Sequence, residues 1–505
     1  MAIYEDIATD GPRRKLRIKS PVTLEPIGEI ECGTRSDVEA AVERARKAQV
    51  DWAATPIDER AKLMWKLLDL YVDAQDEIID AVIAETGKAR TEAIGMEVFS
   101  GCDSISYYAK NAKKFLAPEK RKIHGLMGFA KKLKVVFKPL GVVGLITPWN
   151  GPVALSINPV VQAVMAGNAV VHKPSEVTPF SARIVERLFH EAGFPPDLYQ
   201  VVQGDGATGA ALIESGVDKV SFTGSVATGR KVGEACGRLL IPCTLELGGN
   251  DAMIVCEDAD LDRAVQGALI GSCMNTGQYC CGTERIYVTE GIYEPFVAKV
   301  VEEAGKLRQS DRGEFDVGAT FWDRQLEIIE SHVEDAKAKG ANVRVGGRRN
   351  PDLAGLYYEP TVVTDVSNEM ELMTKETFGP VIAIQKVADE EEALRLANDS
   401  EYGLNGTVWT TDSEKGTRLA ERMETGGVCV NDMALTYGVP EAPFGGVKSS
   451  GVGAVNGKSG IRGYCHAQPI IADRKGKGPL QGGYPYSRKG EDGMQKFIRV
   501  LWQKT

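Results

Sequence analysis

Two adjacent thiols are the sequence's clearest candidates for covalent chemistry. The 505-residue chain has ten cysteines, and only Cys280 and Cys281 are neighbours, at the end of the peptide Asn275–Cys281. This peptide follows an apolar stretch that ends in the acidic Glu246. An activated cysteine is a strong nucleophile, and a carboxylate is a common general base. An inert buried thiol is nevertheless the usual fate of a cysteine, so the peptide alone does not assign a nucleophile.

Two glycine-rich segments come close to phosphate-binding loops. Gly204, Gly206 and Gly209 fit the GxGxxG spacing, but the next apolar strand ends without the acidic residue that a dinucleotide fold supplies there. The segment 224–229 has the spacing of a P-loop, but Arg230 stands where the essential lysine would be. The first loop remains a weak candidate for a cofactor contact. The missing lysine of the second loop argues against a nucleotide triphosphatase as the function of the chain.

Composition and charge narrow the class of protein. The 60 Lys and Arg residues against 70 Asp and Glu residues give a net charge of -10, without the basic footprint of a nucleic-acid-binding surface. No apolar run approaches the roughly 18 residues of a membrane span, and the first residues do not form a signal peptide. The cysteines show no CxxC spacing and the five histidines no HxxxH spacing. We expect a cytoplasmic protein with small-molecule partners, no metal site, no nucleic-acid partner and no membrane span.

The segment from Gly141 to Gly249 is expected to position these residues. Short apolar strands alternate there with helical patterns, which indicates parallel βαβ units. The five predicted strands are 142–146, 169–172, 199–202, 220–222 and 244–246. Thr178, before Pro179, and Ser225 are predicted as helix N-caps. A doubly wound α/β domain results, with ligands at the carboxyl ends of its strands.

The flanking segments are predicted to be largely structural. A capping box of Ser36 and Glu39 predicts a helix from Ser36 to about Ala53, and amphipathic spacing predicts further helices between Pro56 and Ala84. Beyond Glu246 a second α/β domain is predicted. Its expected elements are helices 292–306 and 325–339 and strands 381–387 and 426–430. The apolar stretches 131–138 and 466–472 are expected to pair as an arm, followed by a surface loop 474–488 and an amphipathic end 494–502.

Several separate motifs together resemble the aldehyde dehydrogenase superfamily, in the order that this superfamily shows them. They are Glu85-Thr-Gly-Lys88, Thr147-Pro-Trp-Asn150, Lys173-Pro-Ser-Glu176, Phe222-Thr-Gly-Ser225, Glu246-Leu-Gly-Gly249, Gly277-Gln-Tyr-Cys280, Glu376-Thr-Phe-Gly-Pro380 and Pro443-Phe-Gly-Gly446. The resemblance runs from Ser36 to about His466. It implies two doubly wound parallel-sheet α/β domains and a small β arm for oligomerisation. The expected division is a dinucleotide-binding domain (1–120 and 140–248), a catalytic domain (249–445), and an arm and tail (121–139 and 460–505).

The resemblance assigns chemistry to three residues. Cys280 would attack an aldehyde, and the Asn150 amide with the Cys280 backbone N–H would form the oxyanion hole. Hydride transfer would leave a thioester on Cys280, and Glu246 would activate the water that cleaves it.

The resemblance also implies contacts with a nicotinamide dinucleotide. Lys173 and Glu176 would bind the adenosine ribose, Ser225 the pyrophosphate, and Glu376 with Phe378 the nicotinamide end. Further expected contacts are Thr147, Pro148, Trp149, Ser175, Gly206, Thr223, Gly224 and Leu247. A carboxylate at Glu176 favours NAD, because it repels a 2′-phosphate, although Lys173 leaves NADP possible.

The chain departs from the superfamily pattern near the expected substrate. Gly151 follows Asn150 where many members have an aromatic residue, so the entrance is expected to be wider, with Tyr279 as a substitute wall or a core residue. A second glutamate after the turn 450–453 is absent. The segments 440–446 and 484–486 resemble the branch acting on fatty and aromatic aldehydes. We therefore predict a medium or long aliphatic or an aromatic aldehyde and a homodimer or homotetramer. The alternatives are a semialdehyde dehydrogenase, a coenzyme A acylating enzyme, a hydrolase, or a non-catalytic binding or structural protein.

Overall fold

The described chain divides into two compact units. The computed structural model describes residues 2–7, 13–433, 435–478 and 484–504. One unit, here called the body, comprises 1–116 and 138–466, and the other, the arm unit, comprises 117–137 and 467–505. No helix of the described residues is both long and apolar enough to cross a membrane.

The first large sheet of the body carries the predicted parallel strands. Its order is β18-β10-β9-β6-β7-β8, and all neighbouring pairs are parallel except β18 with β10. The strands are β6 (Val142–Ile146), β7 (Ala169–Lys173), β8 (Tyr199–Val201), β9 (Lys219–Thr223), β10 (Cys243–Glu246) and β18 (Gly451–Val452). The five strands predicted between 142 and 246 are confirmed to within one or two residues. The chain builds outward from β6 through β7 to β8 and then returns to the other side of β6 through β9, so the direction of winding reverses between β6 and β9.

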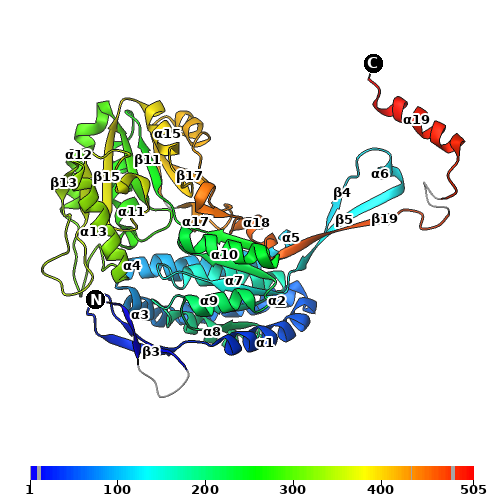
Figure 1. Ribbon diagram of the computed structural model, residues 1–505, viewed down its shortest axis with the longest axis horizontal. Helices are drawn as coiled ribbons and strands as arrows, with labels where there is room; N and C mark the ends of the chain where they lie inside the picture. Colours follow the sequence, from blue (N-terminus) through cyan, green and yellow to red (C-terminus); the bar gives the residue numbers. More distant parts are fainter. Residues whose placement is uncertain (1, 8–12, 434, 479–483, 505) are drawn as a thin grey trace. The chain divides into compact units, whose positions relative to one another are not determined.

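Helices cover both faces of this sheet. Helices α1, α9 and α10 pack together on one face, whereas α2, α5, α7 and α8 pack together on the other. Figure 1 labels them in the lower half of the view. Their bounds, with those of the short helices beside them, are α1 (Arg35–Ala54), α2 (Ile57–Asp73), α3 (Gln75–Thr86), α4 (Arg90–Glu92), the π-helix η1 (Ala93–Phe99), α5 (Ser100–Phe115), α7 (Ala154–Ala166), α8 (Ser181–Ala192), α9 (Gly206–Glu214), α10 (Val226–Leu239) and α18 (Gly457–Arg462).

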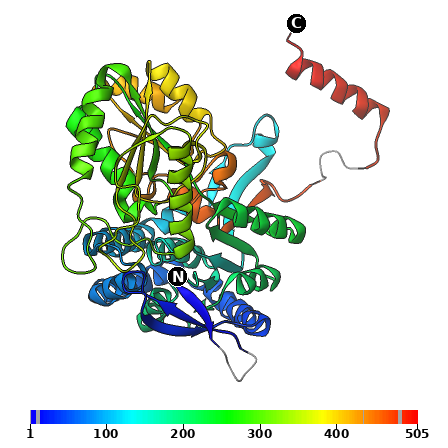
Figure 2. The same cartoon turned by 60° about the vertical axis from the view of Figure 1, so that its left-hand side comes forward.

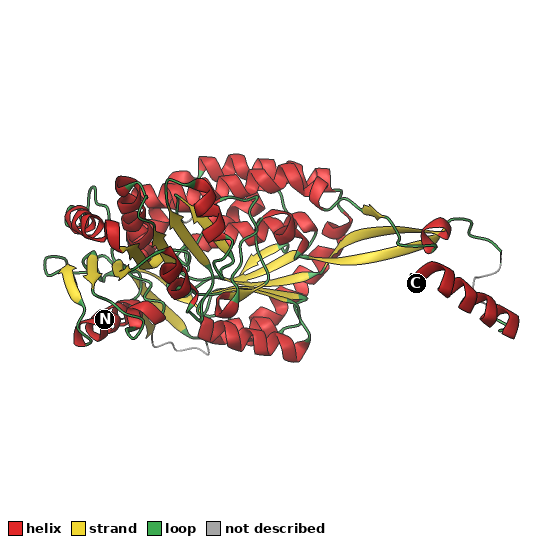
Figure 3. Ribbon diagram, turned by 90° about the horizontal axis from the view of Figure 1, so that it is seen from above, coloured by secondary structure: helices red, strands yellow, loops and turns green. Residues whose placement is uncertain are grey.

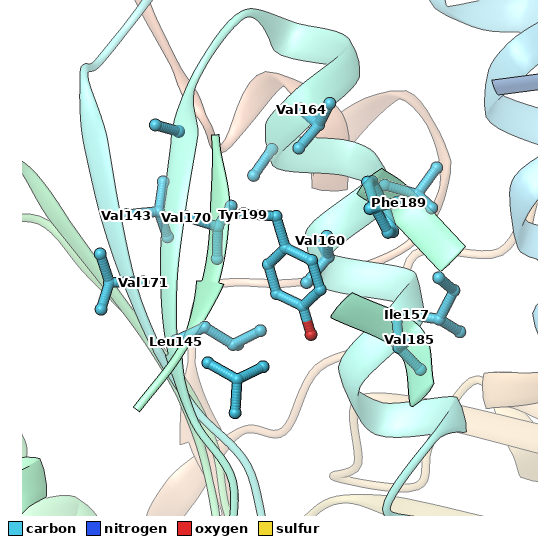
Figure 4. Packing of buried hydrophobic residues seen from close by; sticks show 14 of the residues in the cluster. Val143, Leu145, Ile157, Val160, Val164, Val170, Val171, Val185, Phe189 and Tyr199 are labelled. Atoms are coloured by element: carbon cyan, nitrogen blue, oxygen red, sulfur yellow. The ribbon is translucent and has the colours of Figure 1, made fainter. Parts of the chain in front are cut away.

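The core between this sheet and its helices combines aliphatic and aromatic residues. Figure 4 shows the Tyr199 ring between the strand residues Val143 and Val170 and the helix residue Val160. The Tyr199 hydroxyl lies 3.0 Å from His172 Nδ1, so this buried polar atom has a partner.

The second large sheet has seven strands in the order β13-β14-β15-β12-β11-β16-β17. All pairs are parallel except β13 with β14. The strands are β11 (Asp251–Val255), β12 (Thr283–Thr289), β13 (Asn342–Val345), β14 (Thr361–Thr364), β15 (Val381–Val387), β16 (Asn405–Trp409) and β17 (Gly427–Val430). The accompanying helices are α11 (Leu261–Cys273), the 3₁₀ turn η2 (Met274–Gly277), α12 (Glu290–Ala304), α13 (Asp323–Ala338), α14 (Glu371–Thr374), α15 (Glu390–Asn398), α16 (Ser413–Ala420), α17 (Leu435–Gly438) and the 3₁₀ turn η3 (Lys448–Ser450).

The expected α/β fold with two parallel-sheet regions is therefore confirmed. Helix α12 packs on β12, β14 and β15, and α15 packs on β11, β12 and β15 (Figure 1 and Figure 2). Figure 3 shows the strands of the body with helices above and below them.

A small antiparallel sheet at the N-terminus was not predicted. It consists of β1 (Tyr4–Ile7), β2 (Lys15–Lys19) and β3 (Pro26–Glu31). The predicted pairing of the arm stretches is confirmed by a second three-stranded sheet of order β19-β5-β4. It contains β4 (Glu119–Arg121), β5 (Lys131–Pro139) and β19 (Cys465–Asp473), with the short helix α6 (Met127–Ala130) between β4 and β5.

The tail beyond β19 contains one helix. The amphipathic end predicted for 494–502 is the second half of α19 (Arg488–Trp502). Part of the predicted loop 474–488, residues 479–483, lies outside the described residues.

Two predicted helix caps are wrong and one is confirmed. Helix α1 is capped by Thr34, whose side chain forms a capping box with Asp37, rather than by Ser36 with Glu39. Thr178 does not cap α8, which begins three residues later after Phe180 and has no side-chain cap. The N–H groups of Phe180 and Ser181 donate instead to the buried Glu85 carboxylate, which explains why no local cap is needed. Ser225 caps α10 as predicted, because its hydroxyl accepts from the Thr228 N–H.

Candidate active site

A cavity of about 590 Å³ lies at the carboxyl ends of the parallel strands β6, β9 and β10. This is the position at which doubly wound sheets bind ligands, where the strand order reverses. Ten of the predicted site residues line it: Pro148, Trp149, Asn150, Thr223, Gly224, Ser225, Leu247, Cys280, Glu376 and Phe378.

Cys280 lies in a strained loop between η2 and β12. Asn275, Thr276 and Gly277 have φ of 56°, 59° and 70°, so three successive residues adopt the left-handed conformation. A Cβ on Gly277 would lie 2.0 Å from the Gly379 carbonyl oxygen, so only glycine fits there. Strain of this kind persists where the surrounding structure fixes it, as in many active sites.

The electrostatics of the loop favour the Cys280 thiolate. Its pKa is lowered, chiefly because the Cys281 thiol donates a hydrogen bond to it, with further donation from backbone N–H groups. The pKa of Cys281 is raised, because burial disfavours its own thiolate. Cys280 is therefore the more nucleophilic of the two thiols.

Asn150 is held against the same loop. Its side chain is only 5% exposed, and Nδ2 donates to the Gln278 carbonyl at 3.1 Å. Its backbone carbonyl accepts from Asn275 Nδ2 at 2.9 Å and from Lys88 Nζ at 3.2 Å. The Asn150 amide predicted for the oxyanion hole is thus bonded to Gln278, which precedes the nucleophile Cys280 by two residues.

A buried ion pair forms hydrogen bonds with both ends of the loop between Asn150 and the start of α7. Lys88 Nζ lies 2.6 Å from Glu97 Oε1, and neither side chain is exposed. Glu97 Oε2 accepts from the N–H groups of Val153 and Ala154 at 3.1 and 2.8 Å, where α7 begins. Glu97 lies in the π-helix η1, an irregularity often found at functional sites. Lys88 belongs to a motif quoted from the sequence, but Glu97 was not predicted. Glu97 is the one charged residue of the apolar segment 93–99, which is the signal that could have identified it.

Glu246 ends β10 on the other side of Cys280. It is 6% exposed, and neither carboxylate oxygen has a hydrogen-bond partner. Its pKa is raised well above the usual value, first by burial and then by the Cys280 charge. Glu246 and Cys280 line a second, small pocket of about 20 Å³, which is room for about one water molecule.

Apolar and uncharged polar side chains form the rest of this small pocket. Its other lining residues are Leu155, Asn158, Pro159, Ser221, Thr223, Leu247, Tyr437, Phe444 and Val455. The rings of Tyr437 and Phe444 pack edge to face at 5.1 Å. Tyr279 is not among the lining residues and packs against the core, so Tyr437 and Phe444 supply the aromatic wall. The space beside Gly151 is bounded by Leu155, whose Cγ would lie 3.3 Å from an added Cβ.

Glu376 and Phe378 are positioned by a further carboxylate, that of the partly exposed Glu284. Glu284 accepts from the N–H groups of Thr377 and Phe378 and from Asn250 Nδ2, and burial raises its pKa to about 7. Glu376 Oε1 accepts from the Gly249 N–H at 3.0 Å, and burial raises the pKa of Glu376 as well. Phe378 packs edge to face on Trp149 at 5.5 Å. The sequence analysis did not identify Glu284.

The remaining predicted cofactor residues do not line the large cavity. Lys173 Nζ pairs with Glu176 Oε2 at 3.1 Å at the end of β7, next to Ser175. Thr147 Oγ1 bonds to His172 Nε2 at 2.8 Å. Gly206 begins α9 behind its cap Asp205. These residues follow β6, β7 and β8, so they share the edge of the sheet with the cavity.

Part of the cavity wall comes from a helix to which the sequence analysis gave no role. Trp322, Arg324, Gln325, Glu327, Ile328 and Ser331 line the cavity from the start of α13. The helix itself was predicted, but its spacing gave no sign of a ligand.

One acidic cluster lies far along the chain from these residues. Cys256, Asp258 and Glu390 are close enough to share a ligand, but Lys415 Nζ donates to both carboxylates at 2.5 and 3.0 Å. The Lys415 ammonium group therefore already provides the positive charge that a metal ion would bring to these carboxylates.

Comparisons with known proteins agree with this geometry. A sequence model described as the aldehyde dehydrogenase family matches residues 7–470. A putative succinate-semialdehyde dehydrogenase [NADP(+)] of Mycolicibacterium smegmatis is 42% identical, over 92% of this chain and 89% of that protein. A 4,4′-diapolycopene aldehyde oxidase of Methylomonas sp. is 35% identical, over 96% of this chain and 90% of that protein.

Solved structures give the same result. A Mycobacterium tuberculosis aldehyde dehydrogenase complexed with NAD+ has a TM-score of 0.87 and 34% identity, covering 92% of this chain and 95% of its own. The chain therefore belongs to the aldehyde dehydrogenase family and is an NAD(P)-dependent aldehyde dehydrogenase.

Proposed function

We propose that the chain oxidises an uncharged, apolar aldehyde to its carboxylic acid, with Cys280 as nucleophile and Glu246 as general base. The observation that carries this proposal is that Cys280 lines two cavities. One contains the residues expected around a dinucleotide, and the other contains Glu246. A thiol in this position can react with an aldehyde on one side and receive water on the other.

The first half of the reaction forms a thioester. The Cys280 thiolate adds to the aldehyde carbon, and the developing oxyanion accepts hydrogen bonds from the Asn150 amide and the Cys280 backbone N–H. The bound dinucleotide supplies an acceptor for the hydride that leaves this carbon.

The second half regenerates the enzyme. Glu246 removes a proton from water, the hydroxide adds to the thioester carbon, and the Cys280 thiolate departs. The unpaired oxygens of Glu246 and the raised pKa suit this step, because neither oxygen is committed to another donor.

The residues around the large cavity fit a nicotinamide dinucleotide. Thr223, Gly224 and Ser225 form the N-terminal end of α10, where backbone N–H groups favour a pyrophosphate. A Cβ on Gly224 would lie 2.7 Å from the Phe222 ring, so the close approach of the backbone depends on glycine. Glu376 offers a carboxylate for ribose hydroxyls.

We propose NAD as the preferred cofactor. Glu176 is only partly exposed and lies against Lys173, so a 2′-phosphate beside it would meet a carboxylate. The relative from M. smegmatis is named for NADP(+), and Lys173 offers this chain one cation for a phosphate. The ratio of activity with NAD to activity with NADP therefore tests whether the Glu176 carboxylate or the Lys173 ammonium group has the larger effect on cofactor choice.

The small pocket holds about one water molecule, so the aldehyde chain must extend outside it, but its lining shows which groups lie beside Cys280. Among the described lining residues there is no lysine or arginine, whereas Glu246 contributes a carboxylate. A semialdehyde such as succinic semialdehyde would bring a second negative charge to this wall without a partner. The Tyr437 and Phe444 rings instead give this wall beside Cys280 an apolar surface, which supports an uncharged aldehyde.

The predicted division into dinucleotide-binding segments 1–120 and 140–248 and a catalytic segment 249–445 remains part of this proposal. The six-stranded sheet would carry the dinucleotide, and the loop before β12 would carry the nucleophile. The arm strands β5 and β19 are proposed for contacts between copies in a homodimer or homotetramer.

An absorbance assay tests the proposal. The protein is incubated with NAD or NADP and with hexanal, decanal, benzaldehyde or succinic semialdehyde, and the reduced cofactor is followed. We expect turnover with the first three aldehydes, a preference for NAD, and no reduction by Cys280→Ala, which should still bind NAD. Preferential turnover of succinic semialdehyde would contradict the substrate proposal, and activity of the Cys280→Ala protein would contradict the mechanism.

A further inference from the structure

The C-terminal helix α19 (Arg488–Trp502) has an apolar face that the proposed reaction does not use. Met494, Phe497, Ile498, Leu501 and Trp502 follow the spacing i, i+3, i+4, i+7 and i+8, which places them on one side of a helix. All five are exposed in the structure, from 40% for Leu501 to 64% for Trp502. Large apolar surfaces of this kind commonly mark an interaction site.

The other side of α19 is basic. At 100° per residue, Arg488, Lys489, Lys496 and Arg499 fall on the side opposite the apolar face. Both acidic residues of the helix, Glu491 and Asp492, lie near its start, and Asp492 falls on the basic side between Lys489 and Lys496. The second half of α19 therefore combines an apolar face ending in tryptophan with a cationic face.

The whole arm unit shares this positive charge. Residues 117–137 and 467–505 contain 14 Lys and Arg residues against four Asp and Glu residues, although the full chain has 60 against 70. A second basic surface of the same unit surrounds a cavity of about 700 Å³. Its lining includes Lys120, Arg121, Lys122, Lys132 and Lys134, together with Phe129, which is 82% exposed.

We propose that α19 lies in the surface of an anionic lipid bilayer, with its apolar face toward the acyl chains and its basic face toward the headgroups. A helix with Trp, Phe and Leu on one side and Lys and Arg on the other has the composition of an interfacial membrane helix. Charge complementarity selects anionic rather than neutral lipids, since clustered basic residues beside such a helix bind acidic headgroups. The inference is independent of the reaction at Cys280.

The dimensions of α19 support a helix that lies on the membrane rather than across it. Its 15 residues extend over about 22 Å, which is shorter than the hydrocarbon core of about 30 Å. The apolar stripe lies on one side, as in surface-bound helices, and Val500 is the one large apolar residue of the helix outside it. The arm unit would then hold the body at a surface into which apolar aldehydes partition.

Vesicle sedimentation of the full-length protein tests the proposal. We expect the protein to pellet with vesicles that contain phosphatidylglycerol, and to remain in the supernatant with phosphatidylcholine alone. High salt should release most of the bound protein, because screening weakens the attraction between the basic residues and the headgroups. Failure to pellet with the anionic vesicles overturns the proposal.

Matched variants identify the surface. Phe497→Glu with Leu501→Glu should abolish pelleting, whereas Val50→Glu with Ile270→Glu, at exposed apolar positions of the body, should not. Lys489→Gln with Lys496→Gln should weaken binding about fivefold per residue, from about 1 kcal/mol each. Lys47→Gln with Lys62→Gln, at exposed lysines of α1 and α2, should have little effect. All four variants should oxidise a water-soluble aldehyde at the wild-type rate.

Light scattering separates the membrane from a second copy of the chain as the occupant. We expect the Phe497→Glu, Leu501→Glu protein to keep the wild-type mass in solution. A smaller mass for this variant, combined with no vesicle binding by the wild type, would assign α19 to an interface between copies and overturn the proposal.

Discussion

Two buried glutamates near the nucleophile differ in one respect, which is whether they have partners. Glu97 pairs with Lys88 and accepts two backbone N–H groups. Glu246 is comparably buried, yet neither of its oxygens has a partner and its pKa is raised. The same side chain thus serves as a fixed support in one place and as a group able to accept a proton in the other.

The difference follows from what each carboxylate must do. Breaking a buried ion pair is costly because it leaves one charge without a partner. The Lys88 and Glu97 side chains therefore stay in place, and the groups that they contact are held with them. Those groups are the Asn150 carbonyl and the start of α7. A cation beside Glu246 would instead lower its pKa and weaken it as a base. Leaving Glu246 unpaired costs stability and keeps it basic.

The largest expected effect follows from removing the base. Glu246→Gln should lower steady-state turnover about 10²- to 10⁴-fold, as is typical for loss of a general base. The thioester should still form, because Cys280 and Asn150 are intact. Rapid-mixing absorbance should therefore show one burst of NADH followed by a very slow phase. Loss of the burst itself would instead assign Glu246 to an earlier step.

The pH dependence sharpens this assignment. Glu246 must be ionised to accept a proton, so the rate of thioester hydrolysis should rise with pH as its raised pKa is passed. Thioester formation needs only the Cys280 thiolate, whose pKa is lowered. Turnover should therefore fall toward acidic pH while the burst amplitude persists. A burst that disappears in parallel with turnover would contradict separate titration of the two groups.

The second effect concerns stability, and it uses the same substitution at both glutamates. Glu97→Gln leaves Lys88 buried without a charged partner, which costs about 3–5 kcal/mol for a pair of this kind. Glu246→Gln removes a carboxylate that has no partner, so its unfolding midpoint should match or exceed that of the wild type. Denaturant unfolding at neutral pH measures both. A destabilised Glu246→Gln protein would mean that the carboxylate has a stabilising contact in the folded chain.

The sign of the Glu246 effect depends on pH. A raised folded pKa means that Glu246 contributes its full stability below the unfolded value of about 4.3 and loses it as the pH rises through the folded value. Wild type and Glu246→Gln should therefore unfold at similar midpoints in acid. The unfolding midpoint of the Glu246→Gln protein should rise above that of the wild type as the pH increases.

Lys88→Met tests whether the pair positions Asn150 as well as stabilising the fold. The Asn150 carbonyl would lose one of its two donors, and the oxyanion-hole amide would be less well fixed. We expect a fall in kcat larger than any change in KM for the aldehyde, measured at a temperature where the variant remains folded. Arg183→Met, in an exposed pair with Glu186, is the control and should alter neither value.

The sequence predicted the sheet from local patterns, whereas the residues that line the cavity were predicted from the resemblance to the aldehyde dehydrogenase superfamily. Buried parallel strands such as Val142–Ile146 appear as continuous apolar runs, and the loops after them carry the motifs that include Asn150 and Ser225. Parallel strands end at one edge of a sheet, and a ligand was expected to bind at these carboxyl ends.

What the sequence could not show depends on contacts between distant segments. Glu97 and Glu284 act through hydrogen bonds to backbone groups 56 to 94 residues away, which no local spacing reveals. The cap predicted at Thr178 failed because Glu85, more than 90 residues away, supplies the acceptor instead. The cap of α1 lies two residues earlier than predicted because Thr34 and Asp37 form a capping box there.

The smallest expected effect concerns the thiol beside the nucleophile. Cys281→Ala removes the hydrogen bond that contributes most to the lowered pKa of Cys280. A hydrogen bond from a neighbouring donor stabilises the thiolate, so the Cys280 pKa should rise when the Cys281 thiol is removed. The alkylation rate of Cys280 by iodoacetamide, followed against pH by mass spectrometry, measures this shift.

A second buried thiol provides the control for that measurement. Cys273→Ala removes a thiol of similar burial that contributes nothing to the lowered pKa of Cys280, so the alkylation profile should keep the wild-type midpoint. Cys281→Ser, which retains a donor, should fall between the wild type and Cys281→Ala. An unchanged profile in Cys281→Ala would assign the lowered pKa to the backbone N–H groups of the loop.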